Sequence, residues 1–177
     1  RTIGIMGLGN IGKAIGDSLI NLDFKVVGWG ARPKESLGGI EYYCGHEQLA
    51  DFLSQTDILI NVLPLTEDTK NILTEIELAF LPKGSFIINI GRGGIINESD
   101  LLTSLDSGHI TAVALDVFAQ EPLPENNSLW DHPSVYVTPH IAGQSNPGSA
   151  AQTIADNIRL IEKGETPYPI YSHSSGY

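Results

Sequence analysis

The chain has 177 residues, of which 41% are hydrophobic and 18% charged, with a net charge of −11 and a pI near 4.7. This length suits one ordinary domain with a sizeable core, and no apolar run in the sequence approaches the roughly 20 residues that span a bilayer. The acidic balance argues against nucleic acid or an anionic membrane as a partner, because phosphate groups would be repelled overall.

Apolar runs of strand length alternate with segments of helical periodicity, which is typical of a parallel sheet covered by helices. The predicted strands cover residues 2–7, 24–29, 40–43, 57–62, 85–90, 110–115 and 135–138. The predicted helices cover residues 11–22, 46–54, a stretch between 65 and 81, 97–107 and 149–163. We therefore expect an α/β fold with a Rossmann-type, doubly wound parallel sheet and helices on both faces. It would form one domain over residues 1–163, followed by a tail over residues 164–177.

The first strand leads into the sequence Gly-Leu-Gly-Asn-Ile-Gly at residues 7–12. In this context Gly7 makes a tight turn, Gly9 lets the backbone approach a pyrophosphate, and Gly12 lets the helix pack closely on the strand. The free amide groups of the first helical turn, at Asn10 and Ile11, would face the phosphates. A glycine-rich turn without a ligand is the structural alternative.

The end of the second strand indicates which dinucleotide binds. NAD sites usually place an acid there to bind the adenosine ribose, whereas this chain has Trp29 followed by a loop with Arg32 and Lys34 and no acid between residues 28 and 34. A guanidinium and an ammonium group suit a 2′-phosphate. We therefore expect NADP(H) to be preferred, with NAD(H) as the alternative cofactor; two solvated loop cations would be the structural explanation.

Three later stretches, residues 89–94, 115–122 and 138–143, each lie at or just after the C-terminal end of a predicted strand, where open α/β sheets bind ligands. They carry Arg92, Glu121 and His140. An arginine can bind the carboxylate and carbonyl of a ketoacid, and a histidine can supply a proton. A carboxylate beside that histidine would favour its charged form and hold its ring.

Together with the glycine loop and Leu-Pro-Leu-Thr at residues 63–66, these stretches resemble the D-isomer-specific 2-hydroxyacid dehydrogenase family, and within it the glyoxylate/hydroxypyruvate reductases. The resemblance covers residues 3 to about 163. It implies that Arg92 is the catalytic arginine, Glu121 the glutamate and His140 the general acid, with Asp116 near the nicotinamide. Gly91 departs from the alanine more common in the family. Further positions implied to bind the cofactor are Leu63, Pro64, Thr69, Ile90, Gly91, Arg92, His140, Ala142 and Gly143.

The function expected from this resemblance is the NAD(P)H-dependent reduction of a small 2-ketoacid to the D-2-hydroxyacid, in a cytoplasmic homodimer without a metal. The lone Cys44 excludes an internal disulfide and fits a reducing compartment. The sequence leaves open glyoxylate, hydroxypyruvate and bulkier 2-ketoacids. In this family a separate substrate domain surrounds the nucleotide domain, so we expect the chain to be a piece of a longer protein. Alone, it would bind the cofactor with little turnover.

Two other functions share this fold. A non-catalytic NAD(P)-sensing interaction module would keep the cofactor site but need no proton donor. A methyltransferase is less consistent with the sequence, because it leaves the combination of Arg92, Glu121 and His140 unexplained. For Trp130, both a core position and a place beside the substrate crevice remain open. The other histidines, at positions 46, 109, 132 and 173, are expected on the surface without a role.

Overall fold

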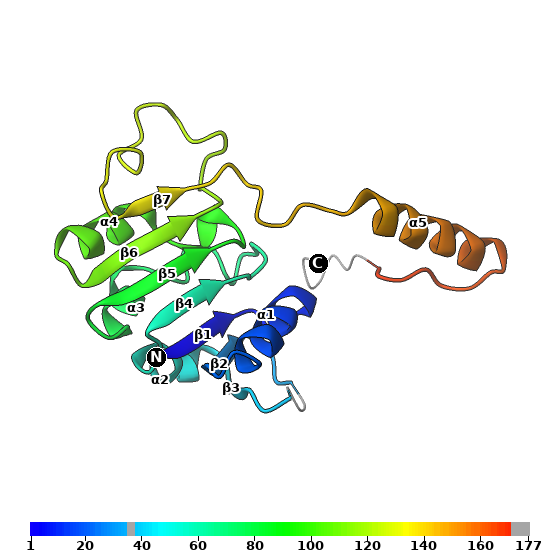
Figure 1. Ribbon diagram of the computed structural model, residues 1–177, viewed down its shortest axis with the longest axis horizontal. Helices are drawn as coiled ribbons and strands as arrows, with labels where there is room; N and C mark the ends of the chain where they lie inside the picture. Colours follow the sequence, from blue (N-terminus) through cyan, green and yellow to red (C-terminus); the bar gives the residue numbers. More distant parts are fainter. Residues whose placement is uncertain (35–37, 171–177) are drawn as a thin grey trace. The chain divides into compact units, whose positions relative to one another are not determined.

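The computed structural model describes residues 1–34 and 38–170, and its centre is a seven-stranded parallel sheet (Figure 1). The strand order is β3-β2-β1-β4-β5-β6-β7, and every neighbouring pair is parallel. This order confirms the predicted Rossmann-type sheet. The strands are β1 (Thr2–Met6), β2 (Lys25–Gly30), β3 (Glu41–Cys44), β4 (Ile58–Asn61), β5 (Ser85–Asn89), β6 (Ile110–Leu115) and β7 (Val135–Val137).

The helices follow the predicted order, with several changed boundaries. They are α1 (Asn10–Ile20), α2 (Leu49–Ser54), α3 (Glu75–Phe80), α4 (Glu98–Asp106) and α5 (Pro147–Glu162), with short 3-10 turns at His46–Gln48 and Gly93–Ile95. The stretch between residues 65 and 81 is helical only in α3, which begins after Thr74, where a capping box with Glu77 fixes its start. Helix α5 begins at Pro147 rather than at residue 149, because the Asn146 side chain caps it.

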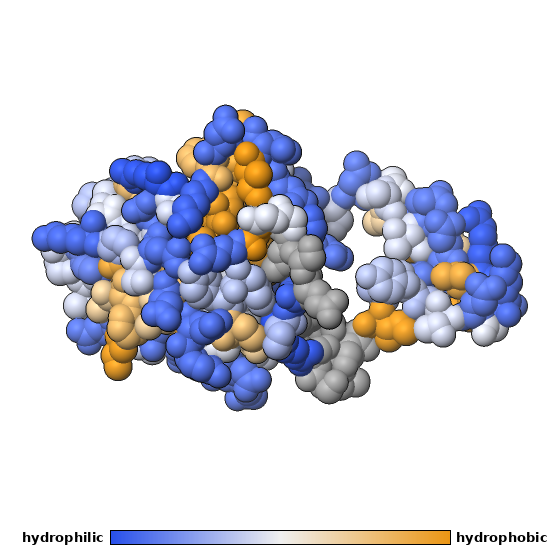
Figure 2. Space-filling model, turned by 90° about the horizontal axis from the view of Figure 1, so that it is seen from below, coloured by the Kyte–Doolittle hydropathy of each residue, from blue (hydrophilic) through white to orange (hydrophobic). Residues whose placement is uncertain are grey.

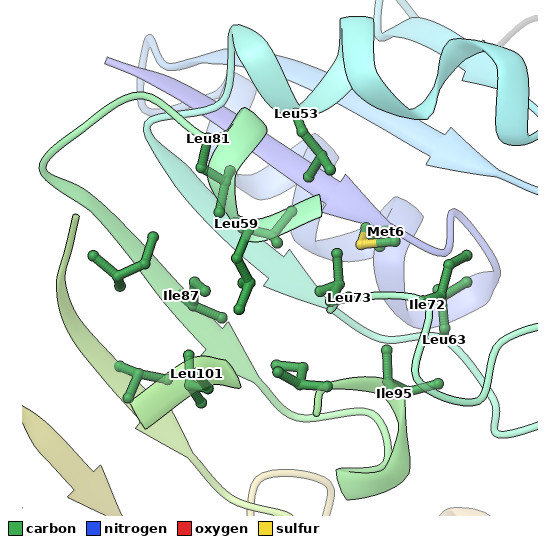
Figure 3. Packing of buried hydrophobic residues seen from close by; sticks show 14 of the residues in the cluster. Met6, Leu53, Leu59, Leu63, Ile72, Leu73, Leu81, Ile87, Ile95 and Leu101 are labelled. Carbon is green, nitrogen blue, oxygen red and sulfur yellow. The ribbon is translucent and has the colours of Figure 1, made fainter. Parts of the chain in front are cut away.

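Side chains that alternate along each strand build two cores, one on each face of the sheet. On one face Ile3, Ile5 and Val26 pack against α1. On the other face the larger core meets α2, α3 and α4; Figure 3 shows Met6 and Leu59 in it with residues from these helices and the turns between them. The helices therefore cover both faces, as predicted, and hold the strand ends in fixed positions.

Strand β1 lies in the middle of the sheet, between β2 and β4. The chain first extends the sheet on one side of β1 with β2 and β3, and then on the other side with β4 to β7. This reversal of strand order creates a topological switch point, where ligands bind beyond the carboxyl ends of the strands in open α/β sheets. The loops after β1, β2, β4, β5 and β6 leave from that same edge because all the strands are parallel. Apart from Trp29 in β2, the predicted site residues of the first unit stand in these loops, in the first turn of α1 or, for His140, directly after β7.

By its contacts the chain divides into two compact units, residues 1–140 and 141–177. Within the second unit, α5 leaves Ile154, Ile158 and Ile161 exposed, and the Tyr168 amide donates to the Asn157 side chain. Figure 2 shows a mostly hydrophilic surface in which apolar residues gather in separate patches. In the part of the chain that the structure describes, no helix has the length and apolar character to cross a membrane. The domain boundary expected after residue 163 stays a prediction, and residues 171–177 of the expected tail lie outside the described part.

Candidate active site

The glycine loop has the conformation that its sequence predicts. Gly7 has φ +97°, which favours glycine, and its amide donates to the Trp29 carbonyl over 2.9 Å. A Cβ on Gly12 would overlap the Gly7 carbonyl oxygen, so the close approach of α1 to this turn requires glycine. A Cβ on Gly9, in contrast, would meet no atom within 4 Å.

The first turn of α1 is therefore tightly packed where Gly12 meets the Gly7 turn, and it is open beside Gly9. No side chain caps this helix, and its first turn holds no acidic residue. Asn10 and Ile11 are exposed, with Ile11 64% accessible. Amide groups at a helix N-terminus with open space beside Gly9 fit the pyrophosphate of a dinucleotide.

The loop after β2 brings a basic residue to the glycine loop. The Lys34 ammonium donates to the Leu8 carbonyl, which holds Lys34 against the glycine loop. Arg32 is exposed, and its carbonyl accepts from the Tyr42 hydroxyl at 2.7 Å. Trp29, predicted to contact the cofactor, is only 1% exposed and its indole donates to the Gly45 carbonyl. The indole thus belongs to the core, while both cations stand at the edge predicted for a 2′-phosphate.

The loops after β4 and β5 meet through two buried asparagines. Asn61 donates from Nδ2 to Oδ1 of Asn89 at 2.8 Å and accepts the Leu63 amide on its own Oδ1. Asn89 accepts the Gly91 amide and donates to the Arg92 carbonyl. Each asparagine is the last residue of its strand and at most 1% exposed. This amide pair fixes the turn that carries Arg92.

Two further predicted cofactor residues, Gly91 and Thr69, determine how the loops after β4 and β5 are arranged. A Cβ on Gly91 would lie 2.8 Å from the Leu63 carbonyl oxygen, so the glycine lets the two loops touch. The Thr69 hydroxyl, 5% exposed as a residue, donates to the Pro64 carbonyl at 2.7 Å and accepts from the Thr66 amide. Thr69 therefore holds the turn after Leu63 and Pro64, and its direct contact with a cofactor stays a prediction.

The backbone at His140 is set by Asp116 and Thr138. The His140 amide donates to the Asp116 carbonyl at 2.9 Å and to the Thr138 carbonyl at 3.1 Å. The Thr138 hydroxyl also donates to the buried Asp116 carboxylate at 2.5 Å. His140 has φ +54°, an uncommon conformation for a residue with a side chain, and such strained positions cluster at functional sites.

The carboxylate of Glu121 joins His140 to the loop after β6. Its Oε1 accepts the Phe118 amide at 3.0 Å, and its Oε2 lies 2.7 Å from His140 Nδ1. The hydrogen bond with His140, followed by the one from the Phe118 amide, lowers the pKa of Glu121 below its usual value of 4.5, and the charge of Arg92 contributes in the same direction. Glu121 is thus an anion at neutral pH that holds the His140 ring.

Glu121 and His140 are in contact, and Arg92 follows β5 at the same edge of the sheet. Arg92 is exposed and its guanidinium donates to the Gly91 carbonyl at 2.7 Å. Joint action of the three residues on one substrate stays a prediction. This arrangement can bind an anionic substrate at a guanidinium and deliver a proton from an imidazole whose second nitrogen faces a carboxylate.

A cavity of about 650 Å³ opens beside the His140–Glu121 pair. It is lined by Phe118, Glu121, Pro122, Leu123, Trp130, Val137, Pro139 and His140. Trp130 is 49% exposed and lines this cavity, so a core position is wrong, and its place beside the substrate stays a prediction. The sequence did not decide between these positions for Trp130, because they depend on the conformation of the loop between β6 and β7.

Four residues that position the predicted ones had no role assigned from the sequence. They are Asn61, Asn89, Phe118 and Thr138, of which the last three lie in the stretches singled out above. A polar residue that closes an apolar strand is the signal that could have identified the two asparagines. His132 is largely buried between Asp106 and the Ser134 amide, so its expected surface position is wrong. His173 lies outside the described residues.

The predicted cofactor residues Ala142 and Gly143 belong to the second unit and stay predictions. Among the described residues no group of three or more His, Cys, Asp or Glu side chains could hold a metal ion. The site is therefore built from one arginine, one His–Glu pair, a glycine loop and an apolar wall.

Comparison with known proteins agrees with this geometry. Residues 1–142 match the family model of the D-isomer specific 2-hydroxyacid dehydrogenase NAD binding domain. Glyoxylate/hydroxypyruvate reductase A of Salmonella paratyphi B is 42% identical over 176 residues, which are 99% of this chain and 56% of the relative. The chain thus spans about half the length of the curated relatives it matches.

Solved structures show the same likeness. A D-isomer specific 2-hydroxyacid dehydrogenase from Xanthobacter autotrophicus Py2, in complex with NADPH and MES, has a TM-score of 0.95 and 40% identity over 99% of this chain and 72% of its own. An NADPH-dependent glyoxylate/hydroxypyruvate reductase from Sinorhizobium meliloti, in complex with NADP and sulfate, has a TM-score of 0.93 and 38% identity, covering 99% of this chain and 57% of that one.

Proposed function

The chain belongs to the D-isomer specific 2-hydroxyacid dehydrogenase family, whose NAD binding domain it matches over residues 1–142. From this premise we propose that it carries the cofactor site and the proton donor of an NADPH-dependent 2-ketoacid reductase. The observation that supports this proposal most strongly is the 2.7 Å contact between His140 and Glu121 at the strand edge that also presents Arg92 and the glycine loop.

The residues of the glycine loop and of the loop after β2 are suited to bind NADPH. The open space at Gly9 and the uncapped start of α1 would hold the pyrophosphate. Arg32 and Lys34, in a loop without an acid, would bind the 2′-phosphate. The two related structures described above were solved with NADPH and NADP respectively. NAD(H) would bind more weakly, because it lacks the group that the two cations would contact.

The reaction consumes a 2-ketoacid, NADPH and a proton and yields a D-2-hydroxyacid and NADP⁺. Bound NADPH would supply the hydride for the carbonyl carbon. Arg92 would bind the carboxylate and polarise the carbonyl oxygen, and His140 would donate the proton to that oxygen. Glu121, kept ionised by its two hydrogen bonds, would orient the His140 ring. Glyoxylate and hydroxypyruvate are the substrates named for similar reductases.

Loss of NADPH absorbance with glyoxylate or hydroxypyruvate tests the proposal. His140→Gln should lower kcat about a hundredfold or more while the Kd for NADPH stays within about twofold, whereas His46→Gln, at an exposed position, should change neither. The chain alone should turn over slowly if the other half of the relatives' length closes the site. An NADPH complex whose slow turnover is unaffected by His140→Gln would favour a cofactor-sensing module.

A further inference from the structure

The cavity beside His140 is larger and more apolar than a small ketoacid requires. Its volume of about 650 Å³ lies in the range of small-molecule sites. The loop after β6 contributes Phe118 and Leu123, and β7 contributes Val137. Apart from Glu121 and His140, its lining side chains carry no charge. Glyoxylate has no side chain to place against such a wall.

Trp130 is an exposed part of this wall and is held in place. Its indole N–H donates to the Pro124 carbonyl at 3.0 Å, and its amide donates to the Asn127 carbonyl. The preceding Leu129 is fully buried and anchors the segment. A fixed, half-exposed aromatic ring beside a cavity loses little conformational entropy when a ligand covers it. Trp29, in contrast, is buried in the core, with only 1% of its surface exposed.

The cavity wall also includes the residues that would deliver the proton. Since His140 and Glu121 line it together with Trp130, a ketoacid whose carbonyl is at His140 could direct its side chain along the apolar wall. Burial of each methylene group there would favour a substrate with a branched side chain over glyoxylate.

We propose that this cavity is a subsite for the apolar side chain of a 2-ketoacid, with Trp130 as a specificity-determining wall. This inference rests on the proposed reductase function, and it extends the substrate class from glyoxylate to 2-ketoacids with an isobutyl-sized or aromatic side chain. The carboxylate and carbonyl would stay at Arg92 and His140.

Kinetics with two ketoacids that differ only in the side chain test this proposal. Trp130→Ala should lower kcat/KM for 4-methyl-2-oxopentanoate about tenfold, while kcat/KM for glyoxylate changes less than about twofold. Trp130→Phe should restore most of the loss, because a phenyl ring keeps an apolar wall. Tyr136→Ala, at a 65% exposed aromatic residue of β7 outside the cavity lining, should affect neither substrate.

A binding measurement keeps the two proposals distinguishable when turnover is slow. With NADP⁺ present, 4-methyl-2-oxopentanoate should change the tryptophan fluorescence of the wild type in a saturable way. The change should be absent in Trp130→Phe, which retains only the buried Trp29. Reduction of glyoxylate without this response, or an equal loss for both ketoacids in Trp130→Ala, would overturn the subsite. A fluorescence response without reduction of either ketoacid would count against the reductase function alone.

Discussion

Asn61 donates its side-chain amide to Asn89 across 2.8 Å and thereby joins the ends of β4 and β5. Neither side chain is exposed by more than 1%, and each also bonds the backbone of the loop that follows its strand. The pair therefore uses buried polar groups to shape the turns at Leu63 and Arg92. Removing one member leaves the other without its partner in the interior.

Asn89→Ala should reduce the free energy of unfolding by about 1–3 kcal/mol, because the Asn61 amide and the Gly91 N–H lose a buried acceptor. Urea unfolding measures this loss. Asn126→Ala, at an exposed position in the loop before β7, serves as the control and should stay within about 0.5 kcal/mol of the wild type. Equal stability of the two variants would show that the amide pair does not hold these turns.

Substitutions of the glycines in the first loop should distinguish a loss of NADPH binding from a loss of stability. Gly9→Ala adds a methyl group in open space, at a φ of −74° that alanine accepts, so stability should stay within about 0.5 kcal/mol. The same methyl group would occupy the space proposed for the pyrophosphate and should weaken NADPH binding about tenfold or more. Isothermal titration and urea unfolding give the two values.

Gly12→Ala should show a different pattern. Its Cβ would overlap the Gly7 carbonyl oxygen, which is backbone and cannot rotate away, so the variant should lose about 1–3 kcal/mol of stability. If Gly9→Ala were as destabilising as Gly12→Ala, or bound NADPH as tightly as the wild type, the assigned roles of the two glycines would be wrong.

Glu121→Gln should change how stability depends on pH. The folded chain lowers the pKa of Glu121 below 4.5, so its ionised form contributes stability above the unfolded pKa. This contribution is lost as the pH falls through the lower, folded pKa. The difference in urea midpoint between wild type and Glu121→Gln should therefore be largest at about pH 7 and shrink below about pH 4. A difference that grows on acidification would contradict the assigned direction.

The two loop cations should determine the choice of dinucleotide. Arg32→Ala should weaken NADPH binding about tenfold and leave NADH within about twofold, because only NADPH carries the 2′-phosphate. Lys70→Ala removes an exposed cation outside this loop and should change neither affinity. Fluorescence titration with both cofactors measures the ratio, and a loss that is equal for NADPH and NADH would exclude a 2′-phosphate contact at Arg32.

Local sequence signals predicted the elements that depend on local chemistry. Apolar runs located all seven strands, and Gly7, Gly9 and Gly12 indicated a turn whose geometry the structure confirms. The parallel order then placed Arg92, Glu121 and His140 at one edge, since each follows a strand. The length of α3 was overestimated, because Thr69 bonds hold residues 64–69 in turns that periodicity does not reveal.

Contacts between distant residues were beyond sequence reasoning. The Asn61–Asn89 pair spans 28 positions, and neither asparagine has a neighbour in sequence that indicates its partner. The orientation of Glu121 depends on the Phe118 amide, a backbone group whose direction is set only by the folded loop. The exposure of Trp130 likewise follows from the path of the loop between β6 and β7.

Equilibrium titration of the chain with NADPH and NADH is the sharpest test of the proposed cofactor site, because the glycine loop, Arg32 and Lys34 all lie in this chain. We expect saturable binding of NADPH with a Kd at least about tenfold below that of NADH, and Gly9→Ala should weaken this binding without unfolding the chain. No saturable binding of NADPH, or equal affinity for the two cofactors, would contradict it.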